Sequence, residues 1–203
     1  MMNGSMKSLS KGILKEAQAR IEGTPIYAKE FLHLGKRAAV DQTLARLVQR
    51  NRLIRAGRGI YVLPIETRFG MRTPSASEIA TATANVRGET IAAHGSSAAN
   101  ALGLTSQVPI REVYLTSGRS RKLRLGAQVV ELRHAPSWQL ASKSRLAGEI
   151  IRALAWLGPS HAEEAIEKLK KQLSKEQLKE IAAARPGVPE WIAKHMSELV
   201  SDG

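Results

Sequence analysis

Five arginines lie between residues 46 and 58, beside a Gly57-Arg58-Gly59 turn sequence. A guanidinium group offers several hydrogen-bond donors in a planar fork, which suits it to phosphate oxygens and to the edge of guanine. The arginines could therefore hold a nucleic acid. Alternatively, they could form a solvated strand edge that discourages pairing with other chains. We favour nucleic-acid binding because of the elements predicted around them.

A second chemical possibility is the stretch HGSSAAN, in which His94 stands two residues before Ser96. A serine beside a histidine can act as a nucleophile with its base. However, such neighbours do not necessarily form a catalytic pair, and the sequence identifies no carboxylate to orient the histidine. The stretch is more typical of a strand-to-helix turn in which Ser96 or Ser97 caps the helix. We predict no catalytic residue here.

The composition restricts the other kinds of site. The chain contains no cysteine, which excludes disulfides, a thiolate zinc site and a cysteine nucleophile. Its five histidines are scattered without metal-ligand spacing. We therefore predict that the protein is not an enzyme and uses no metal and no cofactor.

The length of 203 residues, 43% of them hydrophobic, suits one large domain or two small ones. No apolar run approaches the roughly 18 residues that a membrane span needs, and no signal peptide is recognisable. The sequence predicts a cytoplasmic protein without a membrane partner. We leave the opening MMNGSM out of the fold prediction.

The net charge of +13 is concentrated in the first third of the chain. Residues 1–73 carry +9, residues 74–140 carry +3 and residues 141–203 carry +1. A general need for solubility would not favour one end of the chain. The asymmetry therefore indicates a polyanionic partner that binds the N-terminal region.

Three helices are predicted before the arginine-rich turn. The first is expected between an N-cap at Ser8 or Ser10 and a stop at Gly23. The second is about two turns long and ends before Gly35. The third has an apolar stripe at helical spacing, made of Val40, Leu44, Leu47 and Val48.

Two β-rich runs, residues 52–56 and 59–64, flank the glycine turn, and glycine permits the positive φ angles of a tight hairpin. Three helices followed by a hairpin are the order of a winged helix-turn-helix. In this fold the third helix enters the major groove of DNA, and the hairpin tip reaches a groove or a phosphate. The predicted DNA-binding residues are Lys36, Arg37, Ala39, Gln42, Thr43, Arg46, Gln49, Arg50, Arg55 and Arg58.

A linker is predicted over about residues 65–77, where Gly, Pro and Ser interrupt any period. After it we expect a helix capped by Ser75 or Ser77, a short strand, and a helix that ends at Gly103. Three strands arranged as an antiparallel meander follow, and then four helices. They are expected within residues 111–135 and 144–200, respectively.

The predicted fold class is thus α+β: an N-terminal winged helix-turn-helix, then a mixed α/β domain with a small antiparallel sheet, and a helical C-terminal region. The predicted boundaries are residues 7–68 for the winged helix, 74–157 for the mixed domain and 158–200 for the helical extension.

Three segments together resemble a known family, the AbiEi-type antitoxins and transcriptional regulators. They are VDQTLARLVQRNRLIRAGRGIYVLP, HGSSAANALGLTSQVP and SGRSRKLRLGAQVVELRHAPSW. The resemblance covers about residues 8–157 and leaves the final helical stretch unmatched. It implies an N-terminal domain that binds and represses the promoter of its own operon, and a C-terminal part that counteracts a nucleotidyltransferase-like toxin. It assigns DNA recognition to Ala39, Gln42, Thr43, Arg46, Arg55 and Arg58.

Other functions stay open from the sequence. The second domain could be an enzyme that acts on nucleic acid, with the winged helix as its delivery module. The protein could be a stand-alone regulator without antitoxin activity. It could also be an adaptor whose basic face binds an acidic protein, in which case it would show no sequence preference on DNA. The oligomeric state and the operator sequence are not predicted.

Overall fold

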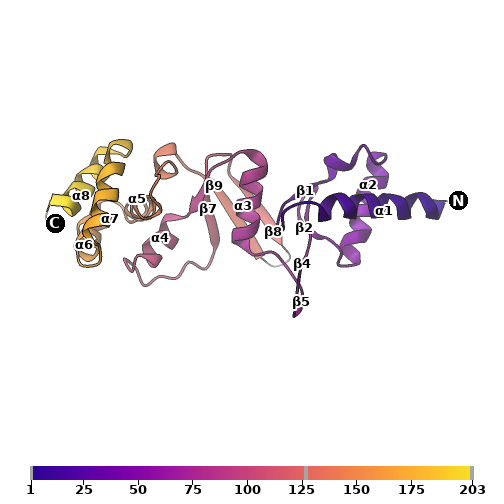
Figure 1. Cartoon of the computed structure of the whole chain (residues 1–203), viewed down its shortest axis with the longest axis horizontal. Coiled ribbons are helices and arrows are strands. Elements are labelled where there is room, and N and C mark those ends of the chain that lie inside the picture. Colours follow the sequence, from indigo (N-terminus) through magenta and orange to yellow (C-terminus); the bar gives the residue numbers. More distant parts are fainter. Residues whose placement is uncertain (1, 126–127, 202–203) are drawn as a thin grey trace. The chain divides into compact units, whose positions relative to one another are not determined.

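The computed structural model describes residues 2–125 and 128–201 and has a mixed α+β fold with small antiparallel sheets (Figure 1). The chain forms two compact units. Unit 1 comprises Met1–Glu89 and Arg121–Glu131, and unit 2 comprises Thr90–Ser120 and Leu132–Gly203. Unit 1 is therefore built from two separate stretches of the sequence, which the predicted boundaries do not reproduce.

The first part of unit 1 contains three helical elements and a three-stranded sheet. The sheet has the order β1-β3-β2 and is antiparallel throughout. The elements are α1 (Met2–Gln18), β1 (Ile26–Tyr27), the 3-10 helix η1 (Ala28–Phe31), α2 (Arg37–Gln49), β2 (Ile54–Gly57) and β3 (Ile60–Val62).

The core of this part confirms the predicted apolar stripe of α2. Val40 and Leu44 are fully buried and Leu47 is almost so, whereas Val48 is half-buried at the margin. They pack with Ile13 of α1 and with Phe31 of η1 and with further residues of the same cluster. Burying these side chains stabilises the arrangement of α2 against α1.

Two predicted helix boundaries are wrong. Helix α1 begins at Met2, so residues 2–6 of the MMNGSM segment belong to it and neither Ser8 nor Ser10 is an N-cap. The helix ends at Gln18, five residues before Gly23, which has a φ of +75° in the following loop. Serine is a common cap but is also tolerated inside a helix, so its presence did not fix the start.

The predicted second helix, of about two α-helical turns, is replaced by a short strand and a 3-10 turn. Residues 26–27 form strand β1 opposite β3, and only one 3-10 turn, η1, follows. The Glu30 carboxylate accepts hydrogen bonds from the backbone N–H of Tyr27 and from the guanidinium of Arg20, both at 2.9 Å. These hydrogen bonds and the pairing with β3 favour an extended backbone at residues 26–27 over a two-turn α-helix.

The rest of unit 1 includes a hairpin in the predicted linker. Strands β4 (Ile65–Thr67) and β5 (Gly70–Arg72) pair antiparallel, and Gly70 has a φ of +108° in the turn. The Thr67 hydroxyl donates to the Gly70 carbonyl and accepts from the N–H of Phe69. The hairpin therefore depends on hydrogen bonds in its turn and not on a periodic pattern of apolar residues.

Helix α3 (Ala76–Arg87) also belongs to unit 1 and has the predicted ends. The Ser75 hydroxyl accepts from the N–H of Glu78, the Glu78 carboxylate accepts from the N–H of Ser75, and Gly88 ends the helix with a left-handed φ of +64°. Arg72 donates two hydrogen bonds to the Glu78 carboxylate, at 2.8 and 2.9 Å. Arg72 and then the Ser75 N–H lower the pKa of Glu78 to about 2.

The lowered pKa of Glu78 predicts an acid-sensitive contribution to stability. The contribution is complete above the ordinary carboxyl pKa of 4.5 and is lost as the pH falls from there toward about 2. Glu78→Gln keeps a carbonyl for the cap but removes the charge. We expect its melting temperature to lie below that of the parent at pH 7 and to approach it as the pH falls to about 3. The difference will be modest because the side chains of both partners are more than one third exposed. A gap that stays constant with pH would contradict the assignment.

Unit 2 combines short strands with five α-helices and two 3-10 helices, η2 (Ser137–Gln139) and η3 (Arg185–Gly187), among its described residues. Its strands β6 and β7 belong to a four-stranded sheet with the order β6-β7-β9-β8. In this sheet, β8 and the first residues of β9 lie within Arg121–Glu131 and count with unit 1. The elements are β6 (Ile91–Ala93), α4 (Gly95–Ala101), β7 (Glu112–Thr116), β8 (Arg121–Leu125), β9 (Gln128–His134), α5 (Arg145–Leu157), α6 (Pro159–Lys170), α7 (Lys175–Ala184) and α8 (Glu190–Ser201).

The strands lie where they were predicted, but their order is not that of a meander. Strand β9 lies between β7 and β8, so β7 and β8 are not neighbours. In a meander each strand pairs with the next one along the chain, and strand patterns alone do not show which strands pair.

The four predicted C-terminal helices are present, and they do not form a separate extension. One hydrophobic core joins α4 and α5 to α6, α7 and α8, through residues such as Ile150, Ile166, Ile181 and Met196, each fully buried or nearly so. The boundary predicted at residue 158 falls inside this core.

Candidate nucleic-acid interface

The exposed face of α2 carries most of the predicted base-contacting residues. Gln42, Arg46 and Gln49 are all exposed, opposite the buried stripe. The structure adds two residues that the sequence analysis missed, Ala38 and Ala45, which are exposed on the same face. The angular spacing of 100° per residue would have found both. Small side chains beside the glutamines allow another molecule to approach the helix closely.

Two predicted contact residues lie elsewhere. Thr43 is only 3% exposed, and its hydroxyl donates to the Ala39 carbonyl at 2.7 Å. Ala39 is half-buried and packs against the core cluster of unit 1. Both stand at the margin of the apolar stripe, where the neighbouring elements cover them, so we remove them from the set of candidate DNA contacts.

The N-terminus of α2 presents two exposed cations, Lys36 and Arg37. The Nε atom of Arg37 donates to Asp41 Oδ2 at 2.9 Å. A pair between exposed side chains contributes little to stability. A phosphate could therefore replace the Asp41 carboxylate as the partner of Arg37 at small cost.

The predicted hairpin is confirmed. Strands β2 and β3 are antiparallel and are joined by a turn in which Gly59 has a φ of +70°, a conformation that glycine adopts without strain. Arg58 is exposed at its tip, and Arg55 is exposed on β2, where its Nε donates to the Gly57 carbonyl at 3.3 Å. Arg50, just after α2, is exposed too.

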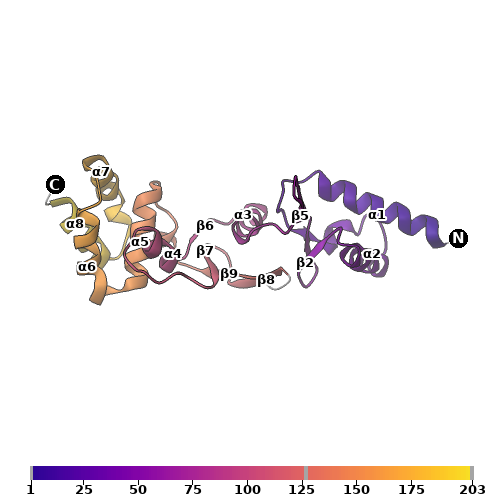
Figure 2. The same ribbon diagram turned by 90° about the horizontal axis from the view of Figure 1, so that it is seen from below.

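Strand β8 adds basic residues that the sequence analysis did not assign to the interface. It contacts β2 within unit 1 and is drawn beside β2 in both ribbon views (Figures 1 and 2). Leu123 is buried, whereas Lys122 and Arg124, its neighbours, are exposed. Arg121 instead forms a bidentate pair with Glu89, at 2.6 and 3.1 Å. The alternation in RKLRL is a strand signal, but nothing in it indicates that β8 lies next to β2.

The charge of the two units reflects this arrangement. Unit 1 contains 18 Lys and Arg against 8 Asp and Glu, a net charge of +10. Unit 2 contains 13 against 10, a net charge of +3. The concentration of positive charge is thus a property of unit 1 as folded, β8 included, and it favours a polyanionic partner there.

The His94–Ser96 pair of the second candidate site has a structural explanation. His94 Nδ1 lies 2.8 Å from the Ser96 hydroxyl and accepts from the Ser96 N–H at 3.3 Å, so His94 is the N-cap of α4. The predicted serine cap is therefore wrong, whereas the predicted strand-to-helix turn is present. Gly95 lies against the backbone of Arg152 in α5, which requires a residue without a side chain at this position.

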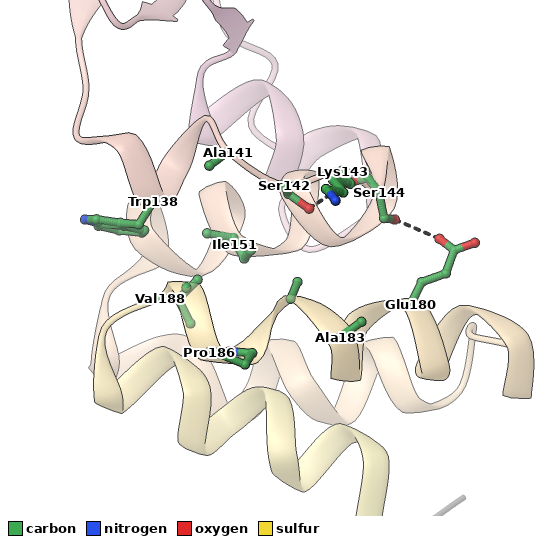
Figure 3. A pocket seen from close by; sticks show the side chains of 12 residues that line it. Trp138, Ala141, Ser142, Lys143, Ser144, Ile151, Glu180, Ala183, Pro186 and Val188 are labelled. Carbon is green, nitrogen blue, oxygen red and sulfur yellow. Dashed lines mark hydrogen bonds between the residues drawn. The ribbon is translucent and has the colours of Figure 1, made fainter.

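A hollow of about 540 Å³ in unit 2 is mainly apolar (Figure 3). Trp138 and Ile151 line it from one side, and Pro186 and Val188 line it from the segment after α7. At one end the Ser144 hydroxyl donates to Glu180 at 2.7 Å. The size and the apolar part of the lining would suit a small apolar molecule.

Residues 2–125 and 128–201 make up the part of the protein that the structure describes. No three side chains of the histidine, cysteine, aspartate and glutamate types are grouped so that they could hold a metal ion in this part of the chain. Each helix found there is too short or too polar to cross a membrane.

The structure thus defines an α+β protein in which unit 1 is strongly basic. The chain belongs to DUF6088, a family of unknown function, whose model matches residues 12–181. No curated protein matches the chain. Among solved structures it is similar to the crystal structure of the RV2827C protein from Mycobacterium tuberculosis, with 13% identity and a TM-score of 0.48 over 95% of this chain and 76% of that one.

Proposed function

We propose that the protein is a transcriptional regulator that binds double-stranded DNA through a winged helix-turn-helix in unit 1. The observation that supports this proposal best is the exposed face of α2, which presents Gln42, Arg46 and Gln49 together with small residues. A hairpin with an arginine at its tip follows α2 in the chain. The order of helices, and the sheet order β1-β3-β2, support this assignment. The second helix of the motif is reduced here to the single turn η1.

In this proposal α2 lies in the major groove. Glutamine pairs well with adenine and arginine with guanine, so Gln42, Gln49 and Arg46 would read base edges. Exposed cations around them would bind phosphates and fix the register of the protein on the duplex. These are Lys36, Arg37, Arg50, Arg55 and Arg58, together with Lys122 and Arg124 of β8.

The resemblance to AbiEi-type regulators supports a more specific proposal. The DNA would be the operator of the protein's own operon, which it would repress in the cytoplasm. Unit 2 would then counteract a nucleotidyltransferase-like toxin encoded beside it. Co-expression of this protein with such a neighbouring toxin gene tests this part of the proposal. Rescue of growth supports the antitoxin role. If growth is not rescued, the protein is a regulator without antitoxin activity.

The DNA-binding proposal is tested by a salt series. Binding of the full chain to a duplex from the region upstream of its own gene should weaken steeply with salt, by about 0.9 log units per tenfold change for each phosphate neutralised. A slope near zero would remove DNA from the function. Equal affinity for the upstream duplex and a random duplex would favour an adaptor or a delivery module of an enzyme.

Arg46→Ala is expected to lower affinity for the cognate operator by about 5- to 150-fold, that is, about 1 to 3 kcal/mol, and to have much less effect on random DNA. A bidentate base contact discriminates between sequences, whereas a phosphate contact does not. Fluorescence anisotropy with both duplexes measures the difference. The matched control is Arg145→Ala, which removes the same charge from an exposed position of unit 2. An equal loss on both duplexes would mean that Arg46 contacts phosphate.

A further inference from the structure

A second hollow in unit 2, of about 310 Å³, is lined by several basic residues. It lies among the start of α4, the end of β9 and the middle of α5. Two arginines and two histidines line it, and no aspartate or glutamate is among its lining residues. The four basic residues are His94, Arg133, His134 and Arg152. We refer to it as the Arg152 hollow.

Arg152 is the group in this hollow that lacks a compensating charge. Its side chain belongs to a residue that is only 8% exposed, in the interior of α5. Its Nη1 donates to the Gln139 carbonyl at 3.2 Å, and its buried Nε has no hydrogen-bond partner in the described structure. The guanidinium is therefore held by a neutral acceptor, and Arg152 and Gln139 both line the hollow.

Glu149, the carboxylate whose charge acts on Arg152, does not form an ion pair with it. Glu149, three residues earlier in α5, accepts from the Nε of Arg145 at 2.9 Å. Burial lowers the pKa of the Arg152 guanidinium, and the more distant Glu149 charge opposes this only in part. Arginine nevertheless stays protonated, so a positive charge is retained in the interior without an ion pair.

A buried unpaired charge is costly, and buried arginines normally have a carboxylate or phosphate partner. A bound anion in the hollow would supply what the protein does not. Guanidinium groups bind planar or tetrahedral oxyanions through two parallel hydrogen bonds, and a second arginine, Arg133, lines the same hollow. The volume of about 310 Å³ accommodates a phosphate group with a small body attached.

We propose that the Arg152 hollow binds a compact oxyanion of the phosphate or phosphomonoester class. The site lies wholly in unit 2 and does not depend on the DNA-binding proposal. It gives unit 2 a small-molecule ligand that would stabilise its helical core.

The test is thermal unfolding and titration calorimetry of the full chain with inorganic phosphate, against potassium chloride at equal ionic strength. Phosphate should raise the melting temperature in a concentration-dependent way, because a ligand that binds only the folded state stabilises it. Arg152→Gln should lower phosphate affinity at least tenfold. Lys194→Gln, which removes an exposed charge from α8 of the same unit, should respond like the parent.

Arg133→Gln is a second variant, at an exposed position that lines the hollow. It tests the proposal even if Arg152→Gln does not fold. It should weaken phosphate binding about threefold or more. Glycerol 3-phosphate forms another arm: tighter binding than inorganic phosphate assigns the site to a phosphomonoester, and equal binding assigns it to free phosphate. No response of the parent beyond that to chloride, or parental affinity in both hollow variants, would overturn the proposal.

Discussion

Leu44→Ala is expected to lower the free energy of unfolding of unit 1 by about 2 to 5 kcal/mol. Leu44 is fully buried at the centre of the core cluster that joins α2 to α1 and η1. Removing its isobutyl group leaves a cavity that the helices on either side can close only in part. This is a large share of the stability of a small domain, so DNA binding should be lost together with the fold.

Chemical denaturation followed by circular dichroism measures the effect. The matched control is Leu32→Ala, the same truncation at a leucine in the same unit that is 43% exposed, where the change should be well below 1 kcal/mol. If Leu44→Ala and Leu32→Ala unfolded at the same denaturant concentration as the parent, α2 would not pack as described.

Gly95→Ala is expected to destabilise unit 2 by about 3 kcal/mol, near the upper end of the range for overpacked sites. A methyl group at this position would overlap the carbonyl oxygen of Arg152 and would lie 2.5 Å from the Cβ atom of Trp156. Neither neighbour can rotate away, because both atoms are fixed to α5. Helix α4 would have to move away from α5, which disturbs the shared core.

The control is Gly187→Ala in the same unit, where a methyl group would meet no atom within 4 Å. Differential scanning calorimetry should show a clear drop in melting temperature for Gly95→Ala and almost none for Gly187→Ala. A similar small effect for both variants would refute the close contact between α4 and α5.

The sequence predicted the parts of unit 1 that local chemistry determines. The spacing of Val40, Leu44 and Leu47 predicted α2, and the two glycines around Arg58 predicted the hairpin. It did not predict η1, because the pairing of β1 with β3 and the contacts of Glu30 decide that segment. Neither a strand pairing with residues far along the chain nor a specific side-chain bond leaves a periodic signal in the sequence.

The same reason explains the errors in the second half. Each strand there was found from its own composition, but the position of β9 between β7 and β8 depends on contacts between strands. The four C-terminal helices were recognised from their boundaries. Their common core with α4 was not, because an amphipathic helix shows which face is buried and not what covers it.

Of the ten predicted DNA contacts, the eight other than Ala39 and Thr43 are exposed. The two exceptions lie at the edge of the buried stripe of α2, where a one-dimensional angular plot cannot tell how far the neighbouring elements extend. Lys122 and Arg124 were missed for the opposite reason: they enter unit 1 from a remote part of the sequence.

The two-part composition of unit 1 also affects when it can fold during synthesis. The first stretch ends at Glu89, but the unit includes residues up to Glu131. At ribosomal rates of about 5 to 20 residues per second, the missing strand emerges roughly 2 to 8 seconds later. In that interval β2 lacks its neighbour β8. A nascent chain released or stalled before residue 131 would therefore expose an incomplete basic unit to chaperones and proteases, even though every residue of α2 and of its hairpin had already been made.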